Sequence, residues 1–259
     1  MNPTLEVIHN RRSVRAYSDQ PITAEEREQI LAATFRAPTA GNMMLYSIIE
    51  VTDQALKDRL AVSCDHQPFI AMAPLVLVFL ADYQRWFDYY TYCGVEQRSR
   101  ELGLPYRTPQ EGDLLLACCD ALIAAQTAVL AAESLGIGSC YIGDILEQCE
   151  THRELLNLPP YTFPITLVCF GHPQSVETPA NRSTRFGQEY ILHQNTYRRF
   201  NGDEMEAMFK HLSRHFKAPD DPAKGPQNIG QSSYFRKFVA DFSIEMARSV
   251  KEYLKSWNG

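Results

Sequence analysis

The most apolar stretch of the chain, residues 114–132 (LLLACCDALIAAQTAVLAA), restricts the possible folds more than any other feature. Its length would suit a membrane span, but Asp120, Gln126 and Thr127 interrupt it with polar groups that are costly in lipid. The stretch therefore predicts a central helix buried inside a folded protein, and no membrane partner is expected. Asp113 is in position to cap the start of this helix.

Two further apolar runs, residues 73–82 and 163–171, have the length of strands that are covered on both faces. Shorter strands are expected at residues 46–51 and within residues 136–144. Helical patterns dominate the rest of the sequence. The chain is therefore expected to be an α+β protein in which a few strands form one central sheet.

Two capping boxes, at residues 23–26 (TAEE) and 151–154 (THRE), predict the starts of helices. A stretch rich in Pro, Gly and polar residues covers residues 217–233, and apolar residues then recur at three- and four-residue steps, as in an amphipathic helix. The expected organisation is a domain over residues 1–216, a linker or long loop over 217–233 and a C-terminal helix over 234–259.

The cysteines and the net charge indicate where the chain works and which partners it lacks. Seven cysteines without any CxxC motif indicate free thiols in a reducing compartment, and the first residues show no apolar signal-peptide region. A cytoplasmic protein without disulfides is expected. The formal net charge of −6 argues against binding to nucleic acid.

Three arginines lie close together in this acidic chain, in the arginine segment, residues 11–15 (RRSVR). Residues two apart in extended backbone face the same side, so Arg11, Ser13 and Arg15 would share one face. Two guanidinium groups and a hydroxyl can hold a phosphate and the polar chain attached to it. Charge alone leaves an alternative open, a solvated cationic turn paired with nearby acids.

Motifs for other chemistry are weak or absent. The glycine-rich stretch at residues 136–143 follows a predicted helix and lacks the GxGxxG spacing, and the sequence contains no P-loop motif. His211 and His215 stand four apart without the glutamate of HExxH, so no metal site is expected. No nucleophile with an adjacent base is evident. No catalytic side chain is therefore expected, and the chemistry would come from a cofactor.

Five segments, in this order and spacing, resemble the nitroreductase family of FMN-dependent oxidoreductases, and in particular its NADPH-preferring nitro/flavin reductase branch. The resemblance implies a central mixed, mostly antiparallel sheet flanked by helices. It also implies a homodimer with the long helix in its core and two FMN sites at its interface, and a C-terminal helix that packs on the body or on the partner subunit. The segments are RRSVRAYSDQPIT, ATFRAPTAGNMMLYSIIEVTD, HQPFIAMAPLVLVFLADYQRW, AAESLGIGSCYIGDI and LPPYTFPITLVCFGHPQ.

The resemblance further implies which residues bind FMN. The arginine segment would hold the phosphate, the ribityl chain and the pyrimidine edge, and a loop of the second chain would lie against the flavin. A glutamine would bond to the pyrimidine edge, a backbone segment would reach the region of N5, and an arginine after the last strand would add to the phosphate site. In that order, the residues are Arg11, Arg12, Ser13 and Arg15; Thr39, Ala40 and Asn42; Gln67; Tyr141, Ile142, Gly143 and Asp144; and Arg182 or Arg185.

Asp144 departs from this branch, which commonly has a glycine there. A carboxylate near the dimethylbenzene ring or N5 would alter the reduction potential or the access of substrates, so the substrate class stays open.

The activity implied by the resemblance is ping-pong hydride transfer, from NADPH to flavin N5 and then to a nitroaromatic, quinone or flavin acceptor. The small-molecule acceptor is not specified by the residues. Two alternatives stay open: a flavin-dependent dehydrogenase or reductive dehalogenase of the same fold, and a non-enzymatic FMN-binding protein.

Overall fold

The computed structural model describes residues 2–175, 184–214 and 216–258. The chain forms two compact units, Met1–Glu177 with Glu245–Gly259, and Thr178–Ile244. This grouping has other boundaries than the division expected from the sequence, which stays a prediction.

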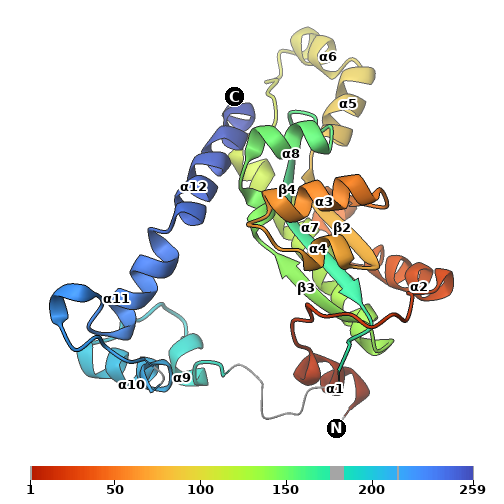
Figure 1. Cartoon of the computed structure of the whole chain (residues 1–259). Helices are drawn as coiled ribbons and strands as arrows, with labels where there is room; N and C mark the ends of the chain where they lie inside the picture. The colour runs from red at the N-terminus through yellow and green to blue at the C-terminus, as the bar shows by residue number, and fades with distance from the viewer. Residues whose placement is uncertain (1, 176–183, 215, 259) are drawn as a thin grey trace. The chain divides into compact units, whose positions relative to one another are not determined.

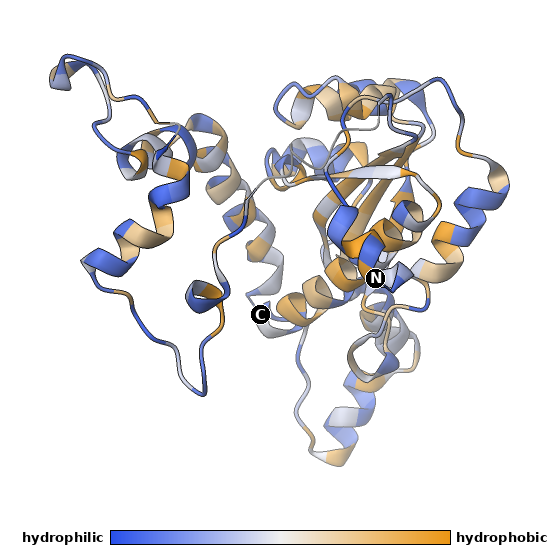
Figure 2. Ribbon diagram, turned by 90° about the horizontal axis from the view of Figure 1, so that it is seen from below, coloured by the Kyte–Doolittle hydropathy of each residue, from blue (hydrophilic) through white to orange (hydrophobic). Residues whose placement is uncertain are grey.

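The first unit is built on a four-stranded sheet with the order β1-β2-β4-β3, in which all neighbouring strands are antiparallel (Figure 1). Among the described residues, parallel pairing is limited to a single bridge between Ser13 and Ser139. The two central strands are buried along almost their whole length, as their continuous apolar runs predict, and the strands are largely orange in Figure 2. The strands are β1 (Tyr46–Glu50), β2 (Leu75–Asp82), β3 (Gly138–Ile142) and β4 (Thr162–Gly171).

Helices cover both faces of the sheet. On one face, Val76 and Val78 of β2 pack in a core cluster with residues of α3 (Gln54–Ser63) and α4 (Phe69–Met72). On the other face, the alternate residues Leu77 and Phe79 pack against α7 and α2 (Ala24–Thr34). The alternation of side chains along a strand thus places successive β2 residues in two separate cores.

Helix α7 (Glu111–Ser134) is the predicted central helix, and it lies against the sheet through a face of small residues. Its length and apolarity would also suit a membrane span. However, its alanine-rich face is part of the core that contains Phe79 and Phe170. The buried alanines of this face are Ala117, Ala121, Ala124, Ala125, Ala128 and Ala132.

The start of α7 differs from the prediction, because Gln110 and not Asp113 is the N-cap. Asp113 occupies the third helical position, where its carboxylate accepts a hydrogen bond from the Gln110 N–H at 2.9 Å and pairs with Arg107. The hydrogen bonds from Arg107 hold the pKa of Asp113 below its usual range.

One capping box is confirmed and the other is wrong. Thr23 and Glu26 exchange the expected hydrogen bonds at the start of α2. Helix α8 (Cys149–Leu155) already begins two residues before Thr151, and its N-cap Gln148 has a left-handed backbone with φ 49°. The pattern at residues 151–154 therefore lies inside a helix that another residue starts.

Shorter helices complete the first unit. The polar-aromatic stretch after β2 forms two helices, which Gly94 separates with its left-handed φ of 67°. The remaining elements are α1 (Pro3–Asn10), the 3₁₀ turn η1 (Ala40–Asn42), α5 (Gln84–Tyr92), α6 (Val95–Leu102) and the 3₁₀ turn η2 (Asp144–Leu146).

The continuous C-terminal helix expected from the apolar periodicity is interrupted in the structure. A π-helical turn, η5 (Tyr234–Phe238), is followed by a bend and then by α12 (Asp241–Leu254) and η6 (Lys255–Trp257). From Glu245 onward the chain belongs to the first unit. The second unit also contains α9 (Gln188–Ile191), α10 (Gly202–Ser213), η4 (Pro222–Lys224) and α11 (Ile229–Ser233).

The end of α12 is anchored in the core. Tyr253 and Trp257 are fully buried, and Arg248 forms ion pairs with Glu150 of α8 and with Glu245 of its own helix. The part of α12 from Glu245 onward thus packs in the first unit of its own chain.

Candidate functional site

The arginine segment runs beside β3. The Val14 N–H donates to the Ser139 carbonyl oxygen at 2.9 Å, next to the parallel bridge of Ser13. Val14 is buried, with an exposed fraction of 4%, whereas Ser13 and Arg15 are exposed. The alternation expected for extended backbone is therefore present, with the polar side chains on the face away from the core.

The close approach of this segment to β3 depends on Gly138. A Cβ atom at Gly138 would lie 2.4 Å from Val14 Cγ2 and 2.8 Å from Val14 Cβ. Real side chains do not tolerate such distances. The missing side chain at Gly138 thus determines how near the arginines come to the end of the sheet.

The arginines influence several groups around them. Burial raises the pKa of Glu133 on α7 to about 7, and the positive charges of Arg11 and Arg12 oppose this shift. Arg12 donates to the Ser175 carbonyl oxygen at 2.7 Å, and the Arg15 guanidinium lies 5.9 Å from the centre of the Phe69 ring. These contacts place the guanidinium groups around the beginning of β3, where they suit a phosphate.

Gln67 and Asp144 lie in direct contact. The Gln67 amide nitrogen donates to Asp144 Oδ2 at 2.6 Å and to the Cys64 carbonyl oxygen at 2.8 Å. Asp65 and His66, with φ of 59° and 53°, turn the chain sharply after α3 and so bring Gln67 to this position. The Asp144 carboxylate, which the resemblance places near N5 or the dimethylbenzene ring, is turned toward Gln67.

The segment after β3 offers exposed backbone. Ile142 is buried, and the Tyr141 hydroxyl donates to Gln126 Oε1 on α7 at 3.2 Å. A Cβ atom at Gly143 would meet nothing within 4 Å, and Gly143 is exposed. A flat group can therefore approach the backbone at Gly143 without obstruction.

The loop with Thr39, Ala40 and Asn42 is held by a residue that sequence reasoning missed. Asp120 of α7, with an exposed fraction of 2%, accepts from the Ala40 N–H at 2.9 Å and from the Leu45 N–H at 3.0 Å. The sequence showed Asp120 only as a polar break in an apolar run. A buried carboxylate needs such donors, so its position was a signal for a structural anchor.

The loop at Thr39 and the arginine segment lie near two different parts of α7, so one chain does not bring all the predicted residues together. Asp120 anchors the loop, whereas Glu133 lies near Arg11 and Arg12. These two α7 residues are 13 positions apart, which corresponds to about 20 Å along an α-helix. The loop and the arginine segment therefore meet opposite parts of the same helix.

Of the two arginines expected after the last strand, the structure describes one. Arg182 lies outside the described residues, as does His215. Arg185 belongs to the second unit, and its guanidinium donates to the Thr184 carbonyl oxygen at 3.4 Å. Within residues 2–175, 184–214 and 216–258, no group of His, Cys, Asp and Glu side chains suits a metal ion.

Replacing Asp120 with alanine is expected to lower the free energy of unfolding by about 3 kcal/mol, because the two N–H groups that it binds would lose their acceptor. Asp120→Asn keeps one acceptor oxygen, so its free energy of unfolding should lie between those of wild type and Asp120→Ala. Urea denaturation followed by circular dichroism measures the difference. A loss below about 0.5 kcal/mol in Asp120→Ala would show that the carboxylate does not anchor the loop.

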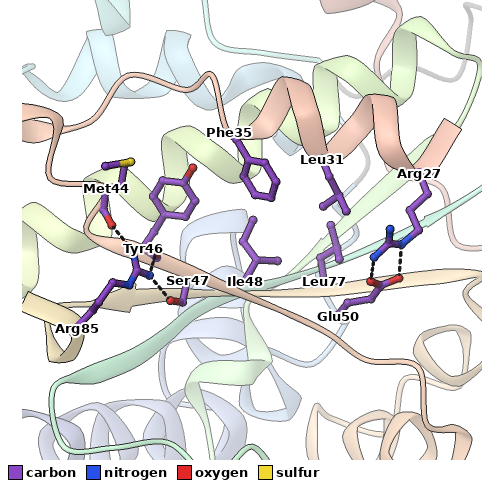
Figure 3. A pocket seen from close by; sticks show the side chains of 10 residues that line it. All are labelled: Arg27, Leu31, Phe35, Met44, Tyr46, Ser47, Ile48, Glu50, Leu77 and Arg85. Atoms are coloured by element: carbon purple, nitrogen blue, oxygen red, sulfur yellow. Dashed lines mark hydrogen bonds and ion pairs between the residues drawn. The ribbon is translucent and has the colours of Figure 1, made fainter. Parts of the chain in front are cut away.

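A separate hollow of about 400 Å³ opens beside the edge strand β1 (Figure 3). An ion pair between Arg27 and Glu50 closes one end, and Arg85 bonds to Ser47 and to the Tyr46 carbonyl oxygen at the other. Apolar side chains lie between them in Figure 3. None of the predicted cofactor-binding residues lines this hollow.

Comparison with known proteins agrees with this arrangement. Residues 8–172 match the profile described as the Nitroreductase family. The chain is 35% identical over 197 residues to an oxygen-insensitive NADPH nitroreductase of Salmonella typhimurium, covering 76% of this chain and 75% of that one. It is 31% identical over 256 residues to an NADPH-flavin oxidoreductase of Vibrio harveyi, covering 99% and 98%.

The fold is similar to solved structures as well. The structure of an NADPH:FMN oxidoreductase from Vibrio harveyi in complex with NAD⁺ superimposes with a TM-score of 0.78 at 25% identity, covering 98% of both chains.

Proposed function

The chain belongs to the nitroreductase family, and we propose that it is an FMN-dependent oxidoreductase that oxidises NADPH and passes the electrons to a small-molecule acceptor. The observation that carries this proposal is the position of the arginine segment beside the beginning of β3, with open backbone at Gly143 after the other end of the same strand. The seven cysteines are all free, which supports a reducing, cytoplasmic setting.

The side chains present fit FMN by their chemistry. The FMN phosphate carries up to about two negative charges, and Arg11, Arg12 and Arg15 supply planar cationic donors for it. Gln67 offers an amide group beside Asp144, after the other end of β3, and Gly143 leaves room for a flat ring. Bound FMN would supply the hydride chemistry, while the protein would bind and orient it and exclude competing reactions.

We infer that the working form is a homodimer, since an apolar stripe remains exposed on the face of α7 away from the sheet. Leu115 has an exposed fraction of 68% and Leu122 of 42%, and Leu116, Cys119 and Ile123 are exposed beside them. Counted from Leu115, the other four residues follow after one, four, seven and eight positions, which is the spacing of a helix–helix contact. Within one chain, the loop at Thr39 and the arginine segment lie far apart. A second copy packed on this stripe would bring its own loop at Thr39 toward the arginine segment of the first chain.

Glutamates at both Leu115 and Leu122 are expected to convert the dimer into a monomer, because each would bury a charge at the centre of the interface. Sedimentation velocity measures the change. The matched control is Val62→Glu with Met72→Glu, two exposed apolar residues on the helices of the opposite sheet face. A wild-type chain that sediments as a monomer would overturn the dimer, and a double variant that stays dimeric would overturn the exposed stripe of α7 as its interface.

The proposed activity is tested by the absorbance spectrum of the purified protein, followed by anaerobic addition of NADPH. Flavin bands that bleach with NADPH are expected, and electron acceptors can then be compared by the rate at which they restore the bands. Bands that persist with both NADPH and NADH would favour a dehydrogenase or a non-enzymatic FMN-binding protein. A protein that shows no flavin, even after incubation with FMN, would overturn the proposal.

A further inference from the structure

The orientation of the Gln67 amide is determined by its partners. Its nitrogen carries two hydrogens, and the Cys64 carbonyl oxygen and Asp144 Oδ2 accept one each, at 2.8 and 2.6 Å. In the described part of the chain, no group donates to the amide oxygen of Gln67. This side chain therefore has an acceptor to offer to a ligand and no donor.

A second carboxyl group, Glu147, lies behind Asp144. Glu147 is buried, with an exposed fraction of 5%, and its Oε1 has no hydrogen-bond partner among the described residues. The charged groups that act on it are the carboxylates of Asp144, of Asp65 in the turn after α3, and of Glu245 in α12. Two further titratable side chains lie in the same cluster: the Cys64 thiol, and His152, which bonds to Ser63 and to the Ile145 carbonyl oxygen.

Such surroundings favour a neutral Glu147. Burial, together with the Asp144 carboxylate, raises the pKa of Glu147 to about 7. A protonated Glu147 can donate its O–H to one carboxyl oxygen of Asp144, while Asp144 Oδ2 accepts from Gln67. One proton on Glu147 thus relieves the repulsion between the two carboxyl groups.

We propose that Asp144, supported by protonated Glu147, is a positioning residue that holds Gln67 with its amide oxygen toward the cofactor. This inference rests on the proposed function. Gln67 would then accept a hydrogen bond from the N–H of the flavin pyrimidine ring, and could not donate to the carbonyl oxygens beside it. Asp144 stands where the resemblance leads us to expect a glycine, and it would help to determine which edge group of FMN the chain recognises.

The arrangement links FMN affinity to pH. Below a pH of about 7, Glu147 carries its proton and the chain from Glu147 to Gln67 is intact. Above it, Glu147 ionises, the two carboxylates repel, and the position of Gln67 is no longer held. The FMN phosphate loses its second proton near pH 6, and this added negative charge would make FMN bind more tightly as pH rises. A weakening of FMN binding above pH 7 can therefore be distinguished from the effect of the phosphate.

The test is the dissociation constant of FMN, measured by quenching of its fluorescence between pH 6 and about pH 8.5. Wild type should bind FMN about fivefold more weakly at the upper end of this range. Asp144→Ala should weaken binding about tenfold at the lower end, as loss of a supporting partner typically does. Asp144→Asn keeps an acceptor for Gln67, so it should bind within about twofold of wild type there, without the dependence on pH.

Glu147→Gln should bind FMN as wild type does at low pH and keep that affinity across the range, because its amide can still donate to Asp144. Glu154→Gln makes the same chemical change at an exposed position of α8 and should leave the pH dependence as in wild type. If Asp144→Ala binds FMN as tightly as wild type, or Glu147→Gln keeps the wild-type pH dependence, the inference is wrong while the proposed function stands. If wild type binds no FMN at any pH, the proposed function itself is overturned.

Discussion

A variant with both Arg11→Ala and Arg15→Ala is expected to be purified colourless and to bind added FMN weakly. Each arginine would contribute charge-assisted hydrogen bonds to the cofactor, worth about 1.5–3 kcal/mol apiece. Losing two such partners corresponds to a fall in affinity of about two to four orders of magnitude. Both side chains lie outside the core, on a segment that the buried Val14 holds in place, so the fold should survive.

The flavin content of the purified variant and its dissociation constant for FMN measure this effect. Arg98→Ala with Arg100→Ala is the matched control, since it removes the same charge from an exposed helix, α6, where both residues pair with nearby glutamates. Riboflavin, which lacks the phosphate, should lose less affinity than FMN. An undiminished flavin content in the double variant would show that the arginine segment does not hold the cofactor.

Replacing Gly138 with alanine is expected to reduce both stability and flavin binding. The added methyl group would lie 2.4 Å from Val14 Cγ2, so either β3 or the arginine segment has to move. Overpacking of this kind costs about 1–3 kcal/mol in the free energy of unfolding. Movement of the segment would also displace Arg11, Ser13 and Arg15 from the strand end.

Urea denaturation and flavin content measure the two parts of this prediction. Gly112→Ala is the control, because a Cβ atom there meets nothing within 4 Å and alanine favours the first turn of α7. Adding Val14→Ala to Gly138→Ala removes the contacts to both Val14 methyl groups but leaves the one to Val14 Cβ, so it should restore stability only in part. A Gly138→Ala protein with wild-type stability and flavin content would contradict the role of this close packing.

The sequence predicted the strands and the central helix well, because their signals are local. The continuous apolar runs at residues 73–82 and 163–171 correspond to β2 and β4, since strands buried on both faces have no polar positions. Helix starts were harder to predict. Asp113 and Thr151 both belong to suitable residue types, but Gln110 and Gln148 take the N-cap positions. Contacts with distant residues lie at both helix starts: Arg107 pairs with Asp113, and the Gln148 N–H donates to Glu245.

The candidate site was predictable where it depends on one segment. The alternation of Arg11, Ser13 and Arg15 around a buried Val14 follows from extended backbone. The supports of the site were not predictable in this way. Asp120 holds a loop 80 residues away in sequence, and Asp144 holds Gln67 from a distance of 77 residues. Such contacts depend on which elements the fold brings together, and no local pattern encodes them.

The two faces of α7 leave the chain unequal freedom to change in evolution. On the sheet side, each alanine fills the narrow space between helix and strands, so a larger residue there disturbs the core. On the outward side, Leu115 is 68%, Leu116 45% and Leu122 42% exposed, so packing within the chain restricts their replacement less. After a gene duplication, a few substitutions on that side would suffice to stop two sister proteins from pairing with each other, while each kept its own fold and cofactor.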